Sequence, residues 1–323
     1  MLNPTRSIIV SVLILTLAPL FVYAQTGVNT STLNPNQIAI LHWYKENLTT
    51  AVAVGSGPQG AAFDGTNIWV ANSNDNTVTK IRAGDAEVLG TFAVSGNFPT
   101  DVAFDGANIW VPNKGSDSVS KLRASDGTLL GVFGVGGAPE RAAFDGANIW
   151  VTNLNDATVS KLRASDGALL GVFPVASGGQ PVGVAFDGAN IWVANQTTNN
   201  VTKLRASDGL VLGTFGVGAK AFSLAFDGAN IWVGTGANHV TKLRASDGTV
   251  LGSFTVGLGP AGIAFDGANI WVSANDGSVT KLRASNGALL GKVTVGGSPV
   301  FGLAFDGANI WVPKYGNGTI SKL

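Results

Sequence analysis

The sequence predicts an all-β protein, a seven-bladed β-propeller built from four-stranded repeats of about 40 residues. The string FDGANIWV occurs six times, and a near copy, FDGTNIWV, lies at 63–70. The tryptophans of these strings follow one another at spacings of 41, 40, 42, 40, 39 and 40 residues. A period near 40 with several short strands per unit is typical of propeller blades. Since helical periodicity is absent and Gly, Asn and Asp interrupt each unit, a helical repeat of similar length does not fit.

Each unit is expected to contain four strands, a to d. In the fourth unit we expect strand a at 182–186, strand b at 191–194, strand c at 201–206 and strand d at 210–217. Asp-Gly-Ala-Asn between a and b, and Ser-Asp-Gly between c and d, are predicted turns because these residues tolerate a left-handed backbone. Strand b places its tryptophan on one face and its Ile and Val on the other. All three can then be buried between neighbouring blades, so the tryptophans are predicted to form the core.

The seventh unit ends after strand c, and its missing strand d is expected at the other end of the propeller. Residues 49–55 lie directly before the first strand a, in the position that strand d occupies before each later strand a. We therefore expect this segment to pair with 319–323. That pairing would remove the open edge that the ring would otherwise leave. The propeller is predicted to span 49–323.

Residues 1–24 have the features of an export signal. Arg6 supplies a positive charge, an apolar run extends to Val22, and small residues precede a cut at Gln25. An uncleaved membrane anchor is the alternative, although Pro19 interrupts the run and its length is at the lower limit for spanning a bilayer. We expect cleavage, a secreted or periplasmic protein, and no membrane contact afterwards.

Residues 25–48 are expected to be a linker followed by a short helix. Asn34 is a good N-cap and Pro35 a good first helical residue. Ile40, Leu41 and Tyr44 would share one face of the helix. This helix could dock on the propeller or bind a partner.

The composition excludes several classes of site. The 20 basic and 20 acidic residues cancel, which argues against a nucleic-acid partner. The absence of cysteine excludes disulfides, thiolate metal sites and a cysteine nucleophile, and two histidines make a histidine-ligated zinc site difficult to build. Asn74-Asp75-Asn76 could ligate calcium through oxygens, but these are also ordinary loop residues. We expect no metal, no cofactor and a monomer.

The units read as an aspartate turn, then IWVAN or IWVTN, then VTKLRASDG. They resemble the YVTN-type β-propeller repeats, a group that includes virginiamycin B lyase-like and quinoprotein amine dehydrogenase heavy-chain-like propellers. The resemblance covers 49–323 and implies the fold rather than an activity. The lyase branch implies a histidine and a glutamate with a divalent metal at the channel mouth. No local motif carries those residues over, and His239 and Glu140, in different units, are the candidates.

Differences among the repeats indicate where function would lie. The a–b and c–d turns are nearly constant and share one face of a propeller, which we expect to be inert. The d–a and b–c loops vary in sequence and share the opposite face. This variable face is therefore the candidate recognition surface. The alternative is that these loops vary only because no structural requirement constrains their sequences. Residues just before strand a should stand at the channel rim, because strand a is innermost. The candidate ligand-binding residues are Asp101, Glu140, Arg141, Lys220, Phe222 and Phe301.

These residues could hold a small anionic or amphipathic ligand. The sequence therefore predicts an exported propeller that acts as a binding or scaffold module for a small molecule or a protein at the channel mouth. One alternative is a lyase, with Glu140 or His239 as general base; this would require a partner within hydrogen-bond reach. A third possibility is a self-associating surface or envelope protein, which would require a large exposed apolar area.

Overall fold

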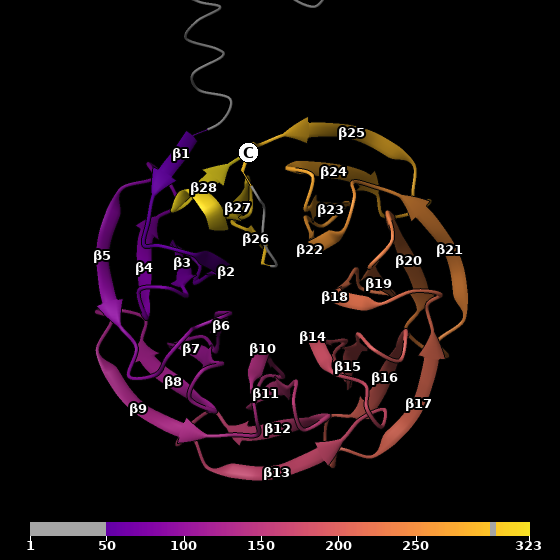
Figure 1. Cartoon of the computed structure of the whole chain (residues 1–323), viewed down its shortest axis with the longest axis horizontal. Helices are drawn as coiled ribbons and strands as arrows, with labels where there is room; N and C mark the ends of the chain where they lie inside the picture. Colours follow the sequence, from indigo (N-terminus) through magenta and orange to yellow (C-terminus); the bar gives the residue numbers. More distant parts are fainter. Residues whose placement is uncertain (1–49, 298–301) are drawn as a thin grey trace, which may run out of the picture. The chain divides into compact units, whose positions relative to one another are not determined.

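The computed structural model describes residues 50–297 and 302–323, and they form a ring of seven four-stranded antiparallel sheets (Figure 1). The predicted all-β class, blade number and strand count are confirmed. The strands of the fourth unit end within one residue of their expected positions. Apart from a single 3-10 turn at Tyr315–Asn317, the described residues contain no helix, and none could therefore cross a membrane as a helix. The predicted signal (1–24) and the linker with its helix (25–48) lie outside the described residues.

In blades 1 to 6 the four strands run in chain order from the innermost to the outermost (Figure 1). Blade 1 consists of β2 (Pro58–Phe63), β3 (Asn67–Asn72), β4 (Thr77–Arg82) and β5 (Val88–Ala93). Blade 2 consists of β6 (Ala103–Phe104), β7 (Asn108–Asn113), β8 (Ser118–Arg123) and β9 (Leu129–Gly134). Blade 3 consists of β10 (Pro139–Phe144), β11 (Asn148–Asn153), β12 (Thr158–Arg163) and β13 (Leu169–Pro174).

Blade 4 consists of β14 (Pro181–Phe186), β15 (Asn190–Asn195), β16 (Asn200–Arg205) and β17 (Val211–Gly216). Blade 5 consists of β18 (Ala221–Phe226), β19 (Asn230–Thr235), β20 (His239–Arg244) and β21 (Val250–Thr255). Blade 6 consists of β22 (Pro260–Phe265), β23 (Asn269–Ala274), β24 (Ser278–Arg283) and β25 (Leu289–Thr294).

Blade 7 combines strands from the two ends of the ring. It contains β26 (Ala304–Phe305), β27 (Ile310–Lys314), β28 (Thr319–Lys322) and, as its outermost strand, β1 (Thr50–Ala53). β1 runs antiparallel to β28, with Thr50 opposite Lys322 and Ala53 opposite Thr319. The predicted closure by the N-terminal strand is confirmed.

The core lies between neighbouring blades, where the tryptophan of one blade packs on the next. Trp192 of blade 4 shares a cluster with Ile231, Val233 and Leu243 of blade 5, all fully buried. Six of the seven ring tryptophans are fully buried, which confirms their assignment to the core. Trp271, at the junction of blades 6 and 7, differs in being only half-buried.

The aspartate of each a–b turn explains why that turn is repeated. Asp187 Oδ1 accepts the backbone N–H groups of Ala189 (2.9 Å) and Asn190 (2.6 Å), and its Oδ2 accepts the indole N–H of Trp192 (2.8 Å). Burial alone would raise the pKa of Asp187, but these hydrogen bonds outweigh it and lower the pKa. All seven turn aspartates accept a tryptophan N–H in this way, at 2.7–2.8 Å.

In six of the seven blades a lysine on strand c links the tryptophan of its own blade to the following blade. Lys203 Nζ lies 5.1 Å from the centre of the Trp192 ring and donates to the carbonyl oxygens of Ala245 (2.7 Å) and Ser246 (3.2 Å) in blade 5. Gly248 completes that c–d turn at φ +75°, and a Cβ there would come within 2.1 Å of Phe215. The lysine and the Ser-Asp-Gly turn are therefore repeated because they form contacts between blades.

We predict that Val52→Asp in β1 lowers the melting temperature by at least ~5 °C or causes aggregation, because it places a charge in the closing blade. Val52 is 8% exposed and packs in the cluster of Ile320 and Trp311. Ala51→Asp, at an exposed position of the same strand, is the matched control. Equal melting temperatures and solubility for the two variants would contradict closure by this strand.

Candidate functional site

Two candidate residues of the variable face, Asp101 and Lys220, lie just before strand a, as the sequence predicted, whereas three others lie inside it. Glu140 and Arg141 lie in β10, where the pairing with β11 shifts between Pro139 and Ala142. Phe222 lies at a similar shift in β18. These shifts are β-bulges, which redirect side chains and often occur next to functional sites. The shifts arise because strand a has more residues than strand b between the proline or alanine that begins strand a and the regular pairing that follows.

Asp101 and Arg141 form a buried ion pair between blades 2 and 3. Arg141 Nη1 lies 3.2 Å from Asp101 Oδ1, and the side chains are 10% and 11% exposed, respectively. The N–H of Ala142 also donates to Asp101 Oδ2 at 3.2 Å. Burial raises the pKa of Asp101, and the positive charge of Arg141 offsets part of this effect.

These two residues occupy equivalent positions in neighbouring blades. The other blades have small residues at this position, which are Gly60, Gly183, Ser223, Gly262 and Gly302. A Cβ on Gly60 would lie 2.5 Å from the Cα of Asp101, and one on Gly302 would lie 2.6 Å from the Cα of Gly60. The inner strands thus approach closely, and the Asp101–Arg141 pair is an unrepeated feature of blades 2 and 3.

Glu140 is held by a second unrepeated ion pair at the same junction. Its carboxylate contacts the ammonium of Lys114, and its side chain is 13% exposed. Thr100 Oγ1 donates to the backbone carbonyl of Glu140 at 2.8 Å. The structure therefore brings together three of the predicted site residues, Asp101, Glu140 and Arg141, with their charges balanced by partners within the protein.

Lys220 and Phe222 form a separate pair on blade 5. A Cβ on Gly236 would lie 3.0 Å from Lys220 Cβ and 3.1 Å from Phe222 Cε2, so both side chains border the same b–c loop. Lys220 is exposed and Phe222 is half-buried. Within the described residues the ammonium of Lys220 has no hydrogen bond or ion pair. This part of blade 5 therefore offers an exposed cation and an aromatic ring that border the same loop.

His239 is not brought to Glu140. It begins β20 in blade 5, where its backbone carbonyl accepts a hydrogen bond from Thr235 Oγ1 at 2.9 Å. Glu140 lies in blade 3, and the structure shows no contact between the two. Phe301, the remaining candidate, lies outside the described residues. Throughout 50–297 and 302–323, no three His, Asp or Glu side chains are grouped so that they could hold a metal ion.

The loop Asn74-Asp75-Asn76 uses its oxygens to order the variable face. Asp75 Oδ2 accepts the N–H of Ser56 at 2.6 Å, and Asn76 Oδ1 accepts the N–H of Phe98 at 2.8 Å. These bonds account for the choice of Asn and Asp in this loop.

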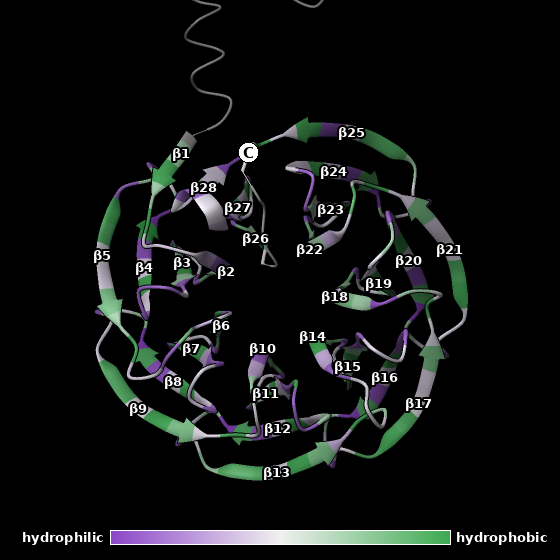
Figure 2. Cartoon of the chain, in the orientation of Figure 1, coloured by the Kyte–Doolittle hydropathy of each residue, from purple (hydrophilic) through white to green (hydrophobic). Residues whose placement is uncertain are grey.

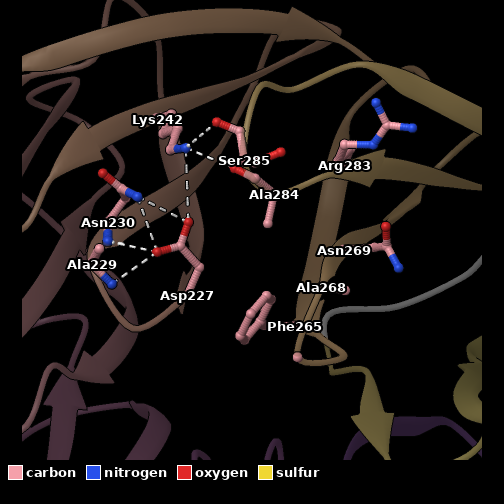
Figure 3. A pocket seen from close by; sticks show the side chains of 11 residues that line it. Asp227, Ala229, Asn230, Lys242, Phe265, Ala268, Asn269, Arg283, Ala284 and Ser285 are labelled. Atoms are coloured by element: carbon pink, nitrogen blue, oxygen red, sulfur yellow. Dashed lines mark hydrogen bonds and ion pairs between the residues drawn. The ribbon is translucent and has the colours of Figure 1, made fainter.

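The opposite face carries open grooves between blades. Figure 3 shows the groove between blades 5 and 6, with a volume of about 560 Å³, where Lys242 donates to Ala284 and Ser285 while Asp227 holds the a–b turn. An equivalent groove of about 620 Å³ lies between blades 2 and 3. Because these grooves repeat and Lys242 and Asp227 are satisfied within the protein, the blade geometry alone accounts for them.

Arg141→Met should destabilise the protein by about 3–5 kcal/mol, because it leaves Asp101 buried without its cation. The folded state then favours protonated Asp101, whose pKa is already raised. Stability of the variant should accordingly rise as the pH falls through the pKa of Asp101 in the folded state. The double variant Asp101→Asn with Arg141→Met should regain most of the loss in urea unfolding. A single variant as stable as wild type would show that the pair has no structural role.

Comparison with known proteins supports the fold. No family model and no curated protein matches the sequence. Among solved structures, hydrazine synthase from Kuenenia stuttgartiensis is similar with a TM-score of 0.73 and 19% identity, over 84% of this chain and 96% of that one. A streptogramin B lyase is similar with a TM-score of 0.73 and 17% identity, over 85% and 96% of the two chains. Both are β-propellers, and the seven-bladed ring of this chain is consistent with a YVTN-type propeller repeat protein.

Proposed function

We propose that this protein is an exported β-propeller that binds a small amphipathic anion, free or presented by a protein, on its variable face. The fold, with a streptogramin B lyase among its structural neighbours, supports a binding, scaffold or lyase-like role. The features of residues 1–24 support export to the periplasm or the outside of the cell. The loops of the variable face differ in sequence from blade to blade. This face could therefore provide contacts that recognise one ligand and not another.

The pair formed by Lys220 and Phe222 is the observation that carries this proposal. Among the predicted site residues, Asp101, Glu140 and Arg141 have charged partners within the protein, so a ligand would have to displace an ion pair to use them. Lys220 is exposed without such a partner in the described part of the chain, and it borders the same b–c loop as the half-buried ring of Phe222. A cation next to an apolar ring suits a ligand with an anionic group and an apolar body.

A lyase-like role is the second candidate, favoured by the likeness to a streptogramin B lyase. It would need a general base positioned by a partner. Glu140 is engaged by Lys114, and His239 lies two blades away. Catalysis through these residues would therefore require a rearrangement of the variable face.

A scaffold role has support from the outer circumference of the ring. The outermost strands of blades 1 to 6 are largely apolar (Figure 2). Their first two residues are Val or Leu side chains that are 37–64% exposed: Val88, Leu89, Leu129, Leu130, Leu169, Leu170, Val211, Leu212, Val250, Leu251, Leu289 and Leu290. An exposed apolar belt of this kind is a feature of interaction surfaces.

The test uses sodium octanoate, an amphipathic anion, titrated into isotope-labelled protein and followed by NMR. We predict shift changes around Lys220 and Phe222. Replacing both by Ala should weaken octanoate binding at least ~10-fold, about 1.4 kcal/mol. Arg205→Ala on the opposite face, which also removes an exposed cation, is the matched control and should change the affinity less than ~2-fold.

Octanoate shifts confined to the outer strands or to the opposite face would contradict the proposal. Streptogramin B serves as the second probe. Its turnover by the protein, lost in His239→Ala or Glu140→Gln but kept in the Lys220 and Phe222 variant, would favour the lyase role instead.

A further inference from the structure

Six of the seven junctions between blades are closed by the same lysine clamp. In each, a strand-c lysine lies over the tryptophan of its own blade and donates to two successive carbonyl oxygens in the next blade's c–d turn. The first Nζ–O distance is 2.6–2.7 Å and the second is 3.1–3.4 Å. Lys322 forms the clamp that joins blade 7 to blade 1, through Ala83 and Gly84.

At the junction of blades 6 and 7, the residues that the structure describes do not form this clamp. Strands c and d of blade 7, β28 and β1, come from opposite ends of the ring, so no c–d turn connects them. Lys281 still lies 4.5 Å from the ring centre of Trp271 and 3.9 Å from Asp266 Oδ2. Among the described residues, however, no carbonyl oxygen accepts a hydrogen bond from its ammonium.

The surroundings of Lys281 are correspondingly open. Its side chain is 32% exposed, against 8% for Lys242 at the neighbouring junction. Trp271 is half-buried, whereas the other six ring tryptophans are fully buried. The cluster around Trp192 includes the turn alanine Ala245, and no turn alanine joins the cluster around Trp271.

The chemistry of this opening indicates what it would accept. Asp266 already balances the charge of Lys281, as Asp227 does for Lys242, so an added anion would meet an existing carboxylate. Two neutral acceptors and a small apolar group would instead reproduce the six closed junctions. Backbone carbonyls of a turn that begins with alanine supply both.

We infer that the junction of blades 6 and 7 is a binding site for a peptide turn of a partner protein. Two successive carbonyl oxygens of the turn accept hydrogen bonds from Lys281, and a small first side chain covers Trp271. This site lies on the face of the repeated turns. It is independent of the ligand proposed for the variable face.

The probe is the acetylated and amidated peptide Leu-Arg-Ala-Ser-Asp-Gly-Ala-Leu-Leu, which has the sequence of residues 162–170. In the full chain, acrylamide should quench Trp271 emission, identified as the signal lost in Trp271→Phe. The peptide should protect this signal, and a scrambled peptide should not. Lys281→Met should weaken peptide binding at least ~10-fold. Lys203→Met, at a closed junction, should change it less than ~2-fold.

Three results would each overturn the inference. Trp271 already protected from acrylamide in the free protein would mean that the junction is closed. Protection by sodium acetate equal to that by the peptide would identify an anion site instead. Peptide binding unchanged in Lys281→Met, with folding verified by circular dichroism, would place the peptide elsewhere.

Discussion

The ring depends on the ionised carboxylate of each a–b turn. Its two oxygens satisfy the turn backbone and the indole N–H of the tryptophan, which places that ring between two blades. The lysine above the ring then reaches the carbonyls of the following blade. A buried tryptophan N–H without a partner would cost free energy, so the carboxylate is what allows so large an apolar side chain to be fully buried. Asp, Trp and Lys therefore act as one unit that joins a blade to the next at six of the seven junctions.

This unit is directional, because the lysine of one blade donates to the c–d turn of the next blade. The contact therefore depends on whether the following blade has a continuous c–d turn. Closure by β1 completes the last sheet without a connecting turn, so within 50–297 and 302–323 the lysine clamp is missing at Lys281. The same closure leaves the clamp from Lys322 to blade 1 intact. The strand β1 therefore completes the backbone pairing of blade 7. Within the described residues, however, it supplies no turn to which Lys281 could donate hydrogen bonds.

The repeat made most of the fold predictable, because each repeated residue has one structural task. Blade number, strand positions, the buried tryptophans and closure by the N-terminal strand all followed from it. The Asp101–Arg141 pair was accessible in principle, since both residues stand at the same position of adjacent units where other units have Gly or Ser. The bulges were not predicted, because they depend on how closely the inner strands approach. Nor was the exposure of Lys281, since its own sequence matches that of its buried equivalents and the difference arises from the next blade.

The most direct test of the central role of the turn carboxylates is a carboxyl ¹³C NMR titration of the folded protein. We expect the pKa of Asp187 and of its six equivalents to lie below the ordinary value of 3.8, and the pKa of Asp101 to lie above it. Because the folded pKa of the turn aspartates is lowered, their contribution to stability is complete above the unfolded pKa and is lost as the pH falls through the folded one. Turn aspartates that titrate at or above 3.8 would contradict the account, since the carboxylate would then not be the form that the tryptophans stabilise.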